Sequence, residues 1–276
     1  NFMPEGPEIH RVANKLAKAL EGKKLQHVSF FYSSIVDQEI LFLNQEVEYV
    51  RAKSKALLIS VGDNVLYSHN QLYGRWTVNL KTTEIKPTGR TLRLELGTDK
   101  HVARLWSATD IMLLEPWMLS GHPYLSKLGP DVADIHTETS AIFGQLHEKR
   151  FRGRQLCHLL LDQSFLAGVG NYLRSEILFD AQLSPFMKLL ELSDIQKSRL
   201  AHSAKKIPHR AFIQKGVTVP SELFESLKSN GLTRRQARHF VFTRDGEPCW
   251  ECGVKISHKR VSGRRLDSYI RCQKVA

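Results

Sequence analysis

The sequence predicts an α+β protein with two domains, and three observations lead to that fold class. An amphipathic pattern with helical spacing covers residues 7–21, short β-rich segments follow to about residue 118, and helical patterns replace them beyond residues 121–123. A chain of 276 residues is long enough to form two cores. We therefore expect an N-terminal helix and β-sandwich at 1–120, a linker at 121–131, a helical domain at 132–240 and a small C-terminal unit at 241–276.

The N-terminal domain is expected to open with one helix and to continue as strands. Ile9, Val12, Leu16 and Leu20 recur at helical spacing, and Gly22 follows them as a stop signal. Turn clusters at 62–64 and 97–99 separate β-rich segments. Many short strands at close spacing are typical of a β-sandwich or barrel. The expected strands are 27–31, 47–50, 56–61, 75–78, 91–96 and 102–106.

The second half of the chain is expected to be helical. The predicted helices are 139–148, 154–161, 170–179 and 193–207. Residues 217–242 have a mixed pattern that favours no single element. The tail from residue 241 is dense in charged and turn residues and is too short for a core of its own, so something other than burial is expected to hold it together.

Charge and cysteine content narrow the class of protein. Forty Lys and Arg against twenty-eight Asp and Glu give a net charge of +12 and a pI near 9.6. This balance favours a polyanionic partner, nucleic acid first, and a solvated basic surface without function is the alternative. No run approaches the length of a membrane span, so we expect a soluble cytoplasmic protein. The four cysteines do not resemble a secreted disulfide framework and fit a reducing compartment.

The stretch Met3-Pro4-Glu5 places a candidate nucleophile beside an acid. If Met3 is removed, Pro4 becomes the N-terminus and its secondary amine is a nucleophile. An α-amino group has a reference pKa of about 8, against about 10.4 for lysine, so more of it is neutral near pH 7. Glu5 would lie within one residue of the attacked carbon, where it can donate or accept a proton. The competing interpretation is an ordinary helix start, because Pro7 and neighbouring acids are common there.

Cys249 and Cys252 form a C-x-x-C knuckle of the kind that chelates zinc, because two intervening residues let both thiolates reach one tetrahedral ion. A complete zinc ribbon would show a second pair about fifteen to twenty residues further on. Only Cys272 is present there. Two interpretations stay open: His258 or another group completes the coordination shell, or the site is empty.

Two loops and one lysine are candidate nucleic-acid contacts. Gly170 and Asn171 end a glycine turn that leads into a helix, which aims backbone N–H groups at an anion such as phosphate. A C-cap glycine explains that pattern equally well. Lys55 lies at a strand start, where a lysine usually marks a solvated edge.

The second loop is His69-Asn70-Gln71-Leu72-Tyr73-Gly74, which combines hydrogen-bonding, apolar and aromatic side chains between two strands. Such a loop can enter a duplex and fill the space that an extruded base leaves. An ordinary hairpin loop is the alternative.

Taken together, these motifs resemble the formamidopyrimidine-DNA glycosylase and endonuclease VIII family. The resemblance covers nearly the whole chain, and its motifs occur in the family's order, at residues 4–8, 55–58, 67–74, 128–131, 160–163, 166–173 and 245–252. Residues 71–73 and 107–110 resemble the endonuclease VIII branch, which excises oxidised pyrimidines, more than the branch that excises oxidised purines.

The resemblance implies a helix–two-turns–helix motif in the second domain, a zinc-finger hairpin with structural zinc at the end, and DNA in the cleft between the domains. It also implies a bifunctional DNA glycosylase and AP lyase of base excision repair. In that reaction an N-terminal amine attacks the sugar C1′, expels the base, forms a Schiff base and permits strand cleavage by β/δ-elimination. The implied partner is double-stranded DNA with oxidised bases or abasic sites. The protein would be a monomer in a bacterial cytoplasm, associated with the nucleoid.

The family's functional residues can be carried over one by one. The resemblance implies that Pro4 is the Schiff-base nucleophile and Glu5 the acid that works on the sugar ring, and that Asp131 and Glu176 support the site. It further implies DNA contacts by Lys55, His69, Asn70, Gln71, Leu72, Tyr73, Gly170, Asn171 and Arg265, and zinc ligation by Cys249, Cys252 and Cys272. Among the DNA contacts, Lys55 and Asn171 would hold phosphates and residues 71–73 would fill the void. Arg264 is an alternative to Arg265 as the finger arginine.

Two features depart from the family pattern. Asn1-Phe2 precede Met3, and Pro4 cannot act as a nucleophile while it is acylated, so a non-catalytic binder of damaged DNA is the competing hypothesis. The family ends in Cys-Pro-x-Cys-Gln, whereas this chain has Tyr269 at the first cysteine's place and Cys272 at the second. One ligand is therefore missing, and any zinc is expected to be held weakly.

Overall fold

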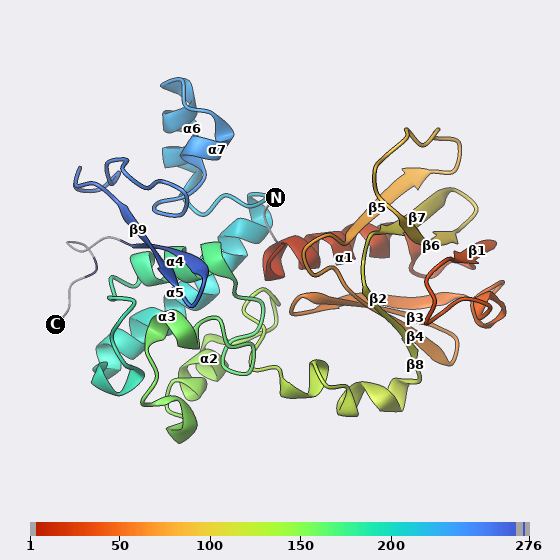
Figure 1. Ribbon diagram of the computed structural model, residues 1–276, viewed down its shortest axis with the longest axis horizontal. Coiled ribbons are helices and arrows are strands. Elements are labelled where there is room, and N and C mark those ends of the chain that lie inside the picture. Colours follow the sequence, from red (N-terminus) through yellow and green to blue (C-terminus); the bar gives the residue numbers. More distant parts are fainter. Residues whose placement is uncertain (1–3, 269–272, 274–276) are drawn as a thin grey trace. The chain divides into compact units, whose positions relative to one another are not determined.

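The structure, a computed structural model, describes residues 4–268 and 273. The chain forms two compact units (Figure 1). The first contains Pro4 and residues 8–126, and the second contains residues 5–7 together with the chain from residue 127 onward.

The first unit is a β-sandwich with α1 (Gly6–Leu20) packed on its core. One sheet has the strand order β1-β6-β7-β5, the other has the order β2-β3-β4-β8, and all neighbouring strands are antiparallel. Helix α1 contributes Ala13, Leu16 and Leu20 to the core, as its amphipathic spacing predicts. The strands are β1 (His27–Phe30), β2 (Val47–Lys53), β3 (Ala56–Val61), β4 (Asn64–His69), β5 (Arg75–Leu80), β6 (Leu92–Gly97), β7 (His101–Trp106) and β8 (Asp110–Leu114).

The predicted α+β class is confirmed, and all six expected strands are present. The sequence prediction omits β4 and β8. Strand β4 has a short apolar run that leads directly into the loop at 70–74, and β8 begins at Asp110 and has only four residues after it, so neither shows a clear period of its own. Both are fixed by pairing, because Tyr67 of β4 lies opposite Leu58 of β3 on one side and Met112 of β8 on the other.

Strand β3 is buried along its whole length because both of its faces are covered. Leu57 and Ile59 face the sandwich core, whereas Leu58 packs with Tyr67 in a second cluster. Tyr124, after the 3₁₀ segment Pro116–Gly121, packs against that second cluster. The turn before β3, which carries Lys55, is therefore attached to a rigid strand.

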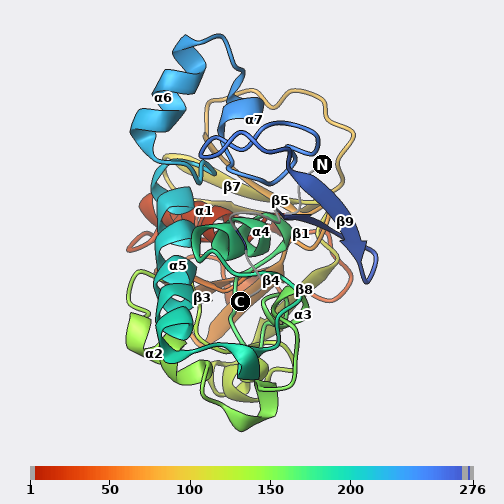
Figure 2. The same cartoon turned by 90° about the vertical axis from the view of Figure 1, so that its left-hand side faces the viewer.

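The second unit is built around α4 (Asn171–Asp180), which is buried from Tyr172 to Phe179. Figure 2 shows α5 (Asp194–Ile213) beside α4 and α2 (Thr139–Gln145). Both α4 and α2 contact α5. The other elements are α3 (Leu156–Leu159), α6 (Ser221–Ser229), α7 (Arg234–Ala237), β9 (Ser257–Val261) and β10 (Arg264–Ser268).

The predicted helices are present, but their boundaries differ. Helix α3 is shorter than expected, and the predicted end of α5 at residue 207 is wrong, because α5 continues through Pro208 to Ile213. Proline removes one backbone hydrogen bond, yet Ile207, Pro208 and Ala211 are all buried, and their packing outweighs that loss. The mixed segment at 217–242 contains α6 and α7. Among residues 4–268 and 273, no helix is both long and apolar enough to cross a membrane.

Candidate functional site

The carboxylate of Glu5 is held at the N-terminus of α4. Its Oε2 accepts hydrogen bonds from the backbone N–H groups of Gly170, at 2.7 Å, and Leu173, at 3.2 Å, and its Oε1 accepts one from Tyr172 at 2.9 Å. These donors and the positive end of the helix dipole favour negative charge at this point. The glycine turn does aim its amides at an anion, as the motif predicts, but that anion is Glu5, not a phosphate.

Three glycines allow this close approach. A Cβ on Gly170 would lie 2.4 Å from Cδ of Glu5, and a Cβ on Gly6 would lie 2.9 Å from Cβ of Ala133. Gly168 has a φ of +91° and its carbonyl accepts a hydrogen bond from the N–H of Gly6 at 2.9 Å. The segment containing Glu5 is therefore fixed by backbone contacts within the second unit. Pro4, which directly precedes Glu5, is half-buried.

Asp131 supports the same turn. It is buried, its Oδ1 accepts a hydrogen bond from the N–H of Ala133 at 3.0 Å, and it forms a parallel bridge with Ala167. The same oxygen lies 3.1 Å from the position of a Cβ on Gly168. The structure thus brings Asp131 to the glycine turn that borders Glu5.

Glu176 lies one helical turn further along α4 and joins it to residues 240–242. Its carboxylate accepts hydrogen bonds from the N–H groups of Phe240, Val241 and Phe242 at 2.8–2.9 Å and from the hydroxyl of Thr218 at 2.6 Å. Burial raises the pKa of Glu176, and these hydrogen bonds oppose that shift. Glu176 is a support beneath the site, away from solvent.

His239 extends this network. Its Nδ1 lies 2.9 Å from the hydroxyl oxygen of Thr218, and the hydroxyl donates its proton to Glu176. The imidazole must therefore carry its proton on Nδ1 to donate in turn. Burial first, and then the positive charge of Arg238, lowers the pKa of His239 well below its usual range.

In the first unit, Lys55 lies in the turn between β2 and β3. Its N–H donates to the hydroxyl of Tyr124 at 3.4 Å, and the hydroxyl of Ser54 lies 3.0 Å from the same oxygen. Ala56, which follows, is paired with His69 on β4. Burial lowers the pKa of His69, with a further lowering from the positive charge of Lys55 and an opposing effect of Asp110. The structure thus places Lys55 beside the start of the 69–74 loop.

The loop at 69–74 is a tight turn with exposed side chains at its tip. Leu72 is 43% exposed and Tyr73 is 61% exposed. The N–H of Gly74 donates to the carbonyl of Asn70 at 2.7 Å, and a Cβ at Gly74 would lie 2.6 Å from that carbonyl oxygen. Gln71 has a φ of +47°, a backbone conformation that a non-glycine residue keeps only where surrounding contacts fix it.

Two side chains outside the loop hold it in place. The hydroxyl of Thr109 donates to the side-chain carbonyl of Gln71 at 3.1 Å, and the guanidinium of Arg90 donates to the carbonyl of Tyr73 at 2.5 Å. Both contacts come from segments distant in sequence. They leave the apolar and aromatic tip exposed while fixing its backbone.

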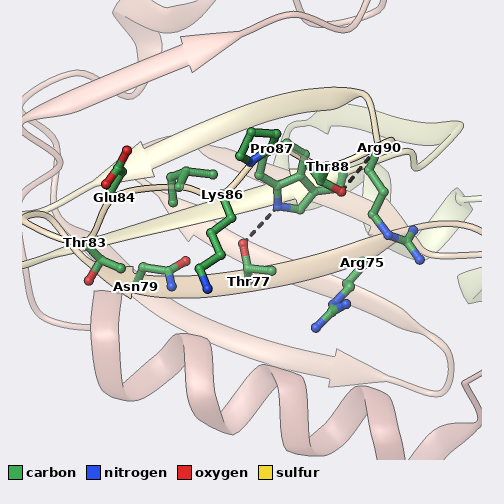
Figure 3. A pocket seen from close by; sticks show the side chains of 11 residues that line it. Arg75, Thr77, Asn79, Thr83, Glu84, Lys86, Pro87, Thr88 and Arg90 are labelled. Atoms are coloured by element: carbon green, nitrogen blue, oxygen red, sulfur yellow. Dashed lines mark hydrogen bonds between the residues drawn. The ribbon is translucent and has the colours of Figure 1, made fainter.

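Arg90 also lines a pocket of about 580 Å³ beside β5 and β7 (Figure 3). Trp106 is one of the lining residues, and its indole N–H donates to the hydroxyl of Thr77 at 2.9 Å. Figure 3 shows the carboxylate of Glu84 at the opposite end from Arg75 and Arg90. The end of the pocket that contains Arg75 and Arg90 is therefore cationic, and Arg75 directly follows the 69–74 loop in the sequence. Its lining comprises Arg75, Thr77, Asn79, Thr83, Glu84, Ile85, Lys86, Pro87, Thr88, Arg90 and Trp106.

The two candidate finger arginines differ in their surroundings. Arg265 makes a bidentate ion pair with Asp267, with N–O distances of 2.7–3.1 Å, and this pairing raises the pKa of Arg265. Arg264 is exposed at the start of β10. Of the two, Arg264 presents the more accessible guanidinium.

The described residues do not provide a complete set of zinc ligands. Cys249 is buried, burial raises the pKa of its thiol, and Cys252 is exposed. Nδ1 of His258 lies 2.7 Å from Oδ2 of Asp245. Within residues 4–268 and 273, no group of three His, Cys, Asp or Glu side chains is placed to hold a metal ion. Cys272, the third predicted ligand, lies outside the described residues.

Sequence reasoning missed several residues that organise these sites. Thr109 lies within the 107–110 motif, so a local signal existed for it. Arg90, Thr218 and Asp267 carry no such signal, because each acts on a partner that only folding brings near. Thr218, for example, lies 42 residues from Glu176 in the sequence.

Comparisons with known proteins agree with this geometry. Residues 3–109 match the model of the formamidopyrimidine-DNA glycosylase N-terminal domain, and residues 128–222 match that of the formamidopyrimidine-DNA glycosylase H2TH domain. The chain belongs to the formamidopyrimidine-DNA glycosylase family. It is accordingly a DNA glycosylase and AP lyase of base excision repair.

Two bacterial relatives of similar length are both endonuclease 8 proteins. Endonuclease 8 of Pectobacterium carotovorum is 40% identical over 273 residues, which is 99% of this chain and 100% of the relative. Endonuclease 8 of Salmonella arizonae is 41% identical with the same coverage. These similarities place the chain in the endonuclease VIII branch of the family.

Solved structures show the same fold. The MutM (Fpg) protein of Thermus thermophilus superposes with a TM-score of 0.77 at 26% identity, covering 98% of both chains. The Fpg of Lactococcus lactis, bound non-covalently to DNA that contains an abasic site, superposes with a TM-score of 0.78 at 20% identity, covering 98% of this chain and all of the other.

Proposed function

We propose that this glycosylase removes oxidised pyrimidines from double-stranded DNA, with Pro4 as the nucleophile. The observation that carries the proposal is the fixed carboxylate of Glu5, which directly follows Pro4 and is held by three backbone amides. The free imino group of Pro4 attacks C1′ of the damaged nucleotide, and the bond between C1′ and the base breaks with its electron pair leaving on the base. The amine then loses its proton, the ring bond between C1′ and O4′ breaks with a proton delivered to O4′ by Glu5, and a cationic imine forms between Pro4 and C1′. The imine acidifies the C2′ hydrogen, and elimination cleaves the strand.

Glu5 supplies the proton transfer at the sugar. A carboxylate that accepts three N–H groups keeps a fixed position, so the proton that it gives or takes travels a short and constant path. The support comes from a rigid element, because α4 is buried along most of its length. Asp131 and Glu176 act through this support and position the site without touching the sugar.

DNA recognition is assigned to the exposed loop and to polar and cationic side chains outside it. Gln71, Leu72 and Tyr73 fill the space of the extruded base, which offsets part of the few kcal/mol that base flipping costs. Lys55 and Asn171 hold the phosphates that flank the lesion. Arg264, which is exposed, grips phosphate from the hairpin, whereas the guanidinium of Arg265 is engaged by Asp267.

Borohydride trapping on a duplex with an abasic site tests the nucleophile. The reductant freezes a Schiff base as a covalent protein–DNA species. We expect abundant trapping for a chain whose intact mass shows that it begins at Pro4. Pro4→Gly should lose most of this trapping. Lys55→Ala should still be trapped when the DNA concentration is high enough to saturate the variant. Trapping by a chain that begins at Asn1 would exclude Pro4 and make Lys55 the candidate.

The choice of lesion needs a separate measurement. We expect faster single-turnover excision from a duplex that contains thymine glycol than from one that contains 8-oxoguanine. The loop at 71–73 and the 40% identity to endonuclease 8 support this choice. A strong preference for 8-oxoguanine would assign the enzyme to oxidised purines, with the Pro4 chemistry unchanged.

Zinc at the finger is a finer proposal that depends on Cys249, Cys252 and Cys272. Three thiolates leave one coordination position open, so we propose binding weaker than in a four-cysteine ribbon. Metal analysis after dialysis tests this. A full equivalent of tightly held zinc would contradict it.

A further inference from the structure

The β9–β10 hairpin is attached to α4 by hydrogen bonds at consecutive residues. Nη2 of Arg174 donates to the carbonyl of Arg265 at 2.7 Å, and the N–H of Asp267 donates to the hydroxyl of Ser175 at 3.2 Å. Neither Arg174 nor Ser175 has measurable exposure. Since α4 is buried from Tyr172 to Phe179, these bonds join the hairpin to the interior of the second unit.

Inside the hairpin, Asp267 is the central group. Its side chain is fully buried, and its carboxylate receives both Nε and Nη2 of Arg265. A buried carboxylate is stable only when it is paired and hydrogen-bonded, and a bidentate guanidinium fixes its geometry as well as its charge. Leu266, between the two, is fully buried and adds an apolar anchor.

The ends of the hairpin are also held by protein groups. The turn Ser262–Gly263, with φ of +49° and +75°, has the geometry that closes a two-residue hairpin and sets its register. At the other end of β9, Asp245 accepts a hydrogen bond from the N–H of His258 at 3.1 Å and pairs with its imidazole. Further on, the side chain of Gln273 donates to the carbonyl of Leu183 at 3.1 Å.

The cysteine knuckle has internal support as well. The N–H of Cys249 donates to the carbonyl of Val254, and the N–H of Gly253 donates to the carbonyl of Cys249, both at 2.9 Å. Arg244 lies 3.4 Å from the ring centroid of Trp250 and donates to the carbonyl of Pro248 at 2.5 Å. The backbone of the knuckle is thus closed by bonds that involve no thiol.

We propose that Arg174, Ser175, Arg265 and Asp267 form a clamp that holds the hairpin on α4, so that the hairpin keeps its position without a metal ion. In a zinc finger the ion replaces a core and its removal unfolds the finger. Among the described residues only two thiols are available as zinc ligands, whereas the clamp combines an ion pair on the buried carboxylate of Asp267, two hydrogen bonds to α4 and the buried side chain of Leu266. Zinc bound at the cysteines would therefore contribute less than the clamp to holding the hairpin on α4.

The test compares chelation with disruption of the clamp in the full chain. Hydrogen exchange of residues 257–268 and the melting temperature are measured with and without EDTA, for the wild type, Asp267→Asn and Cys252→Ser. We expect EDTA and Cys252→Ser to leave both readouts unchanged. Asp267→Asn should raise exchange across the hairpin at least about tenfold and lower the melting temperature by about 5 °C, since it leaves Arg265 without its carboxylate.

Arg264→Gln is the matched control, because it removes a guanidinium from the same strand at an exposed position and should leave exchange in the hairpin unchanged. If Asp267→Asn fails to fold, Arg265→Lys keeps the charge, removes the bidentate geometry and should raise exchange in the same residues. The proposal is overturned if EDTA loosens the hairpin as much as the clamp variants do, or if those variants leave exchange unchanged. Neither readout depends on glycosylase activity, so the result is independent of the proposed function.

Discussion

At the scale of single residues, the site depends on small side chains as much as on reactive ones. Glu5 reaches the amides of α4 only because position 170 has no Cβ. The loop at 70–74 likewise needs Gly74, whose Cβ would collide with the backbone of Asn70. Neither requirement follows from the sequence pattern, in which Gly170 is equally well explained as a helix cap.

Gly170→Ala is expected to lower base excision by roughly 100-fold, because the new methyl group displaces Glu5 by about 1 Å from its amides. Single-turnover excision from a lesion-bearing duplex measures the effect. Gly153→Ala is the control, since a Cβ there meets nothing within 4 Å. Equal rates for both variants would mean that the position of Glu5 does not limit catalysis.

Arg90→Ala should reduce cleavage of a duplex abasic site by about tenfold, through loss of one charge-assisted hydrogen bond to the carbonyl of Tyr73. An abasic site in a single strand has no opposing base and needs no void filling, so cleavage there should be spared. The ratio of the two rates is the readout. Lys81→Ala, which removes a cation at the opposite end of β5 from the loop, should leave the ratio unchanged. An equal loss on both substrates in Arg90→Ala would contradict a role in the loop.

At the scale of elements, the prediction from sequence succeeds where a segment carries its own period and fails where a partner defines it. Helix α1 shows a clear apolar stripe and is placed within one residue at each end. Strands β4 and β8 are fixed by pairing with their neighbours, and α5 continues through Pro208 because tertiary packing holds it. The two carboxylates show the same difference. The sequence identifies Glu5 and Glu176 as candidate site residues, but it does not indicate which backbone N–H groups bind them.

The network of Glu176, Thr218 and His239 should make stability depend on pH. The folded pKa of His239 is depressed, so between that value and the unfolded pKa near 6.5 only the unfolded chain binds the proton. Its contribution is complete above about pH 6.5 and is lost as the pH falls, by up to about 1.4 kcal/mol per pH unit. Chemical denaturation at several pH values measures this slope.

His239→Asn keeps an N–H donor toward Thr218 and removes the titration, so it should flatten the slope below pH 6.5. The difference between wild type and variant isolates this residue from the carboxylates that titrate in the same range. His136→Asn, at an exposed position, should keep the wild-type slope. Identical slopes for wild type and His239→Asn would contradict a lowered pKa of His239 in the folded protein.

At the scale of the whole molecule, the net charge of +12 favours binding to the phosphates of DNA. If the protein neutralises roughly six phosphates, log K should fall against log salt with a slope near about −5, because each contact releases a counterion. Binding to a lesion-bearing duplex at several salt concentrations measures it. A slope near zero would contradict phosphate contact as the basis of affinity.

The manner in which Glu5 is held has a consequence for how the enzyme tolerates mutation. Three of its hydrogen bonds come from main-chain amides, and a point mutation that exchanges one side chain for another leaves a main-chain N–H in place. Among the coded amino acids only proline deletes that donor. The sequence at Tyr172 and Leu173 can therefore drift with respect to this contact, provided that their side chains still pack. For these three hydrogen bonds, the position of the acid depends on the missing Cβ at position 170 and on the point at which α4 begins.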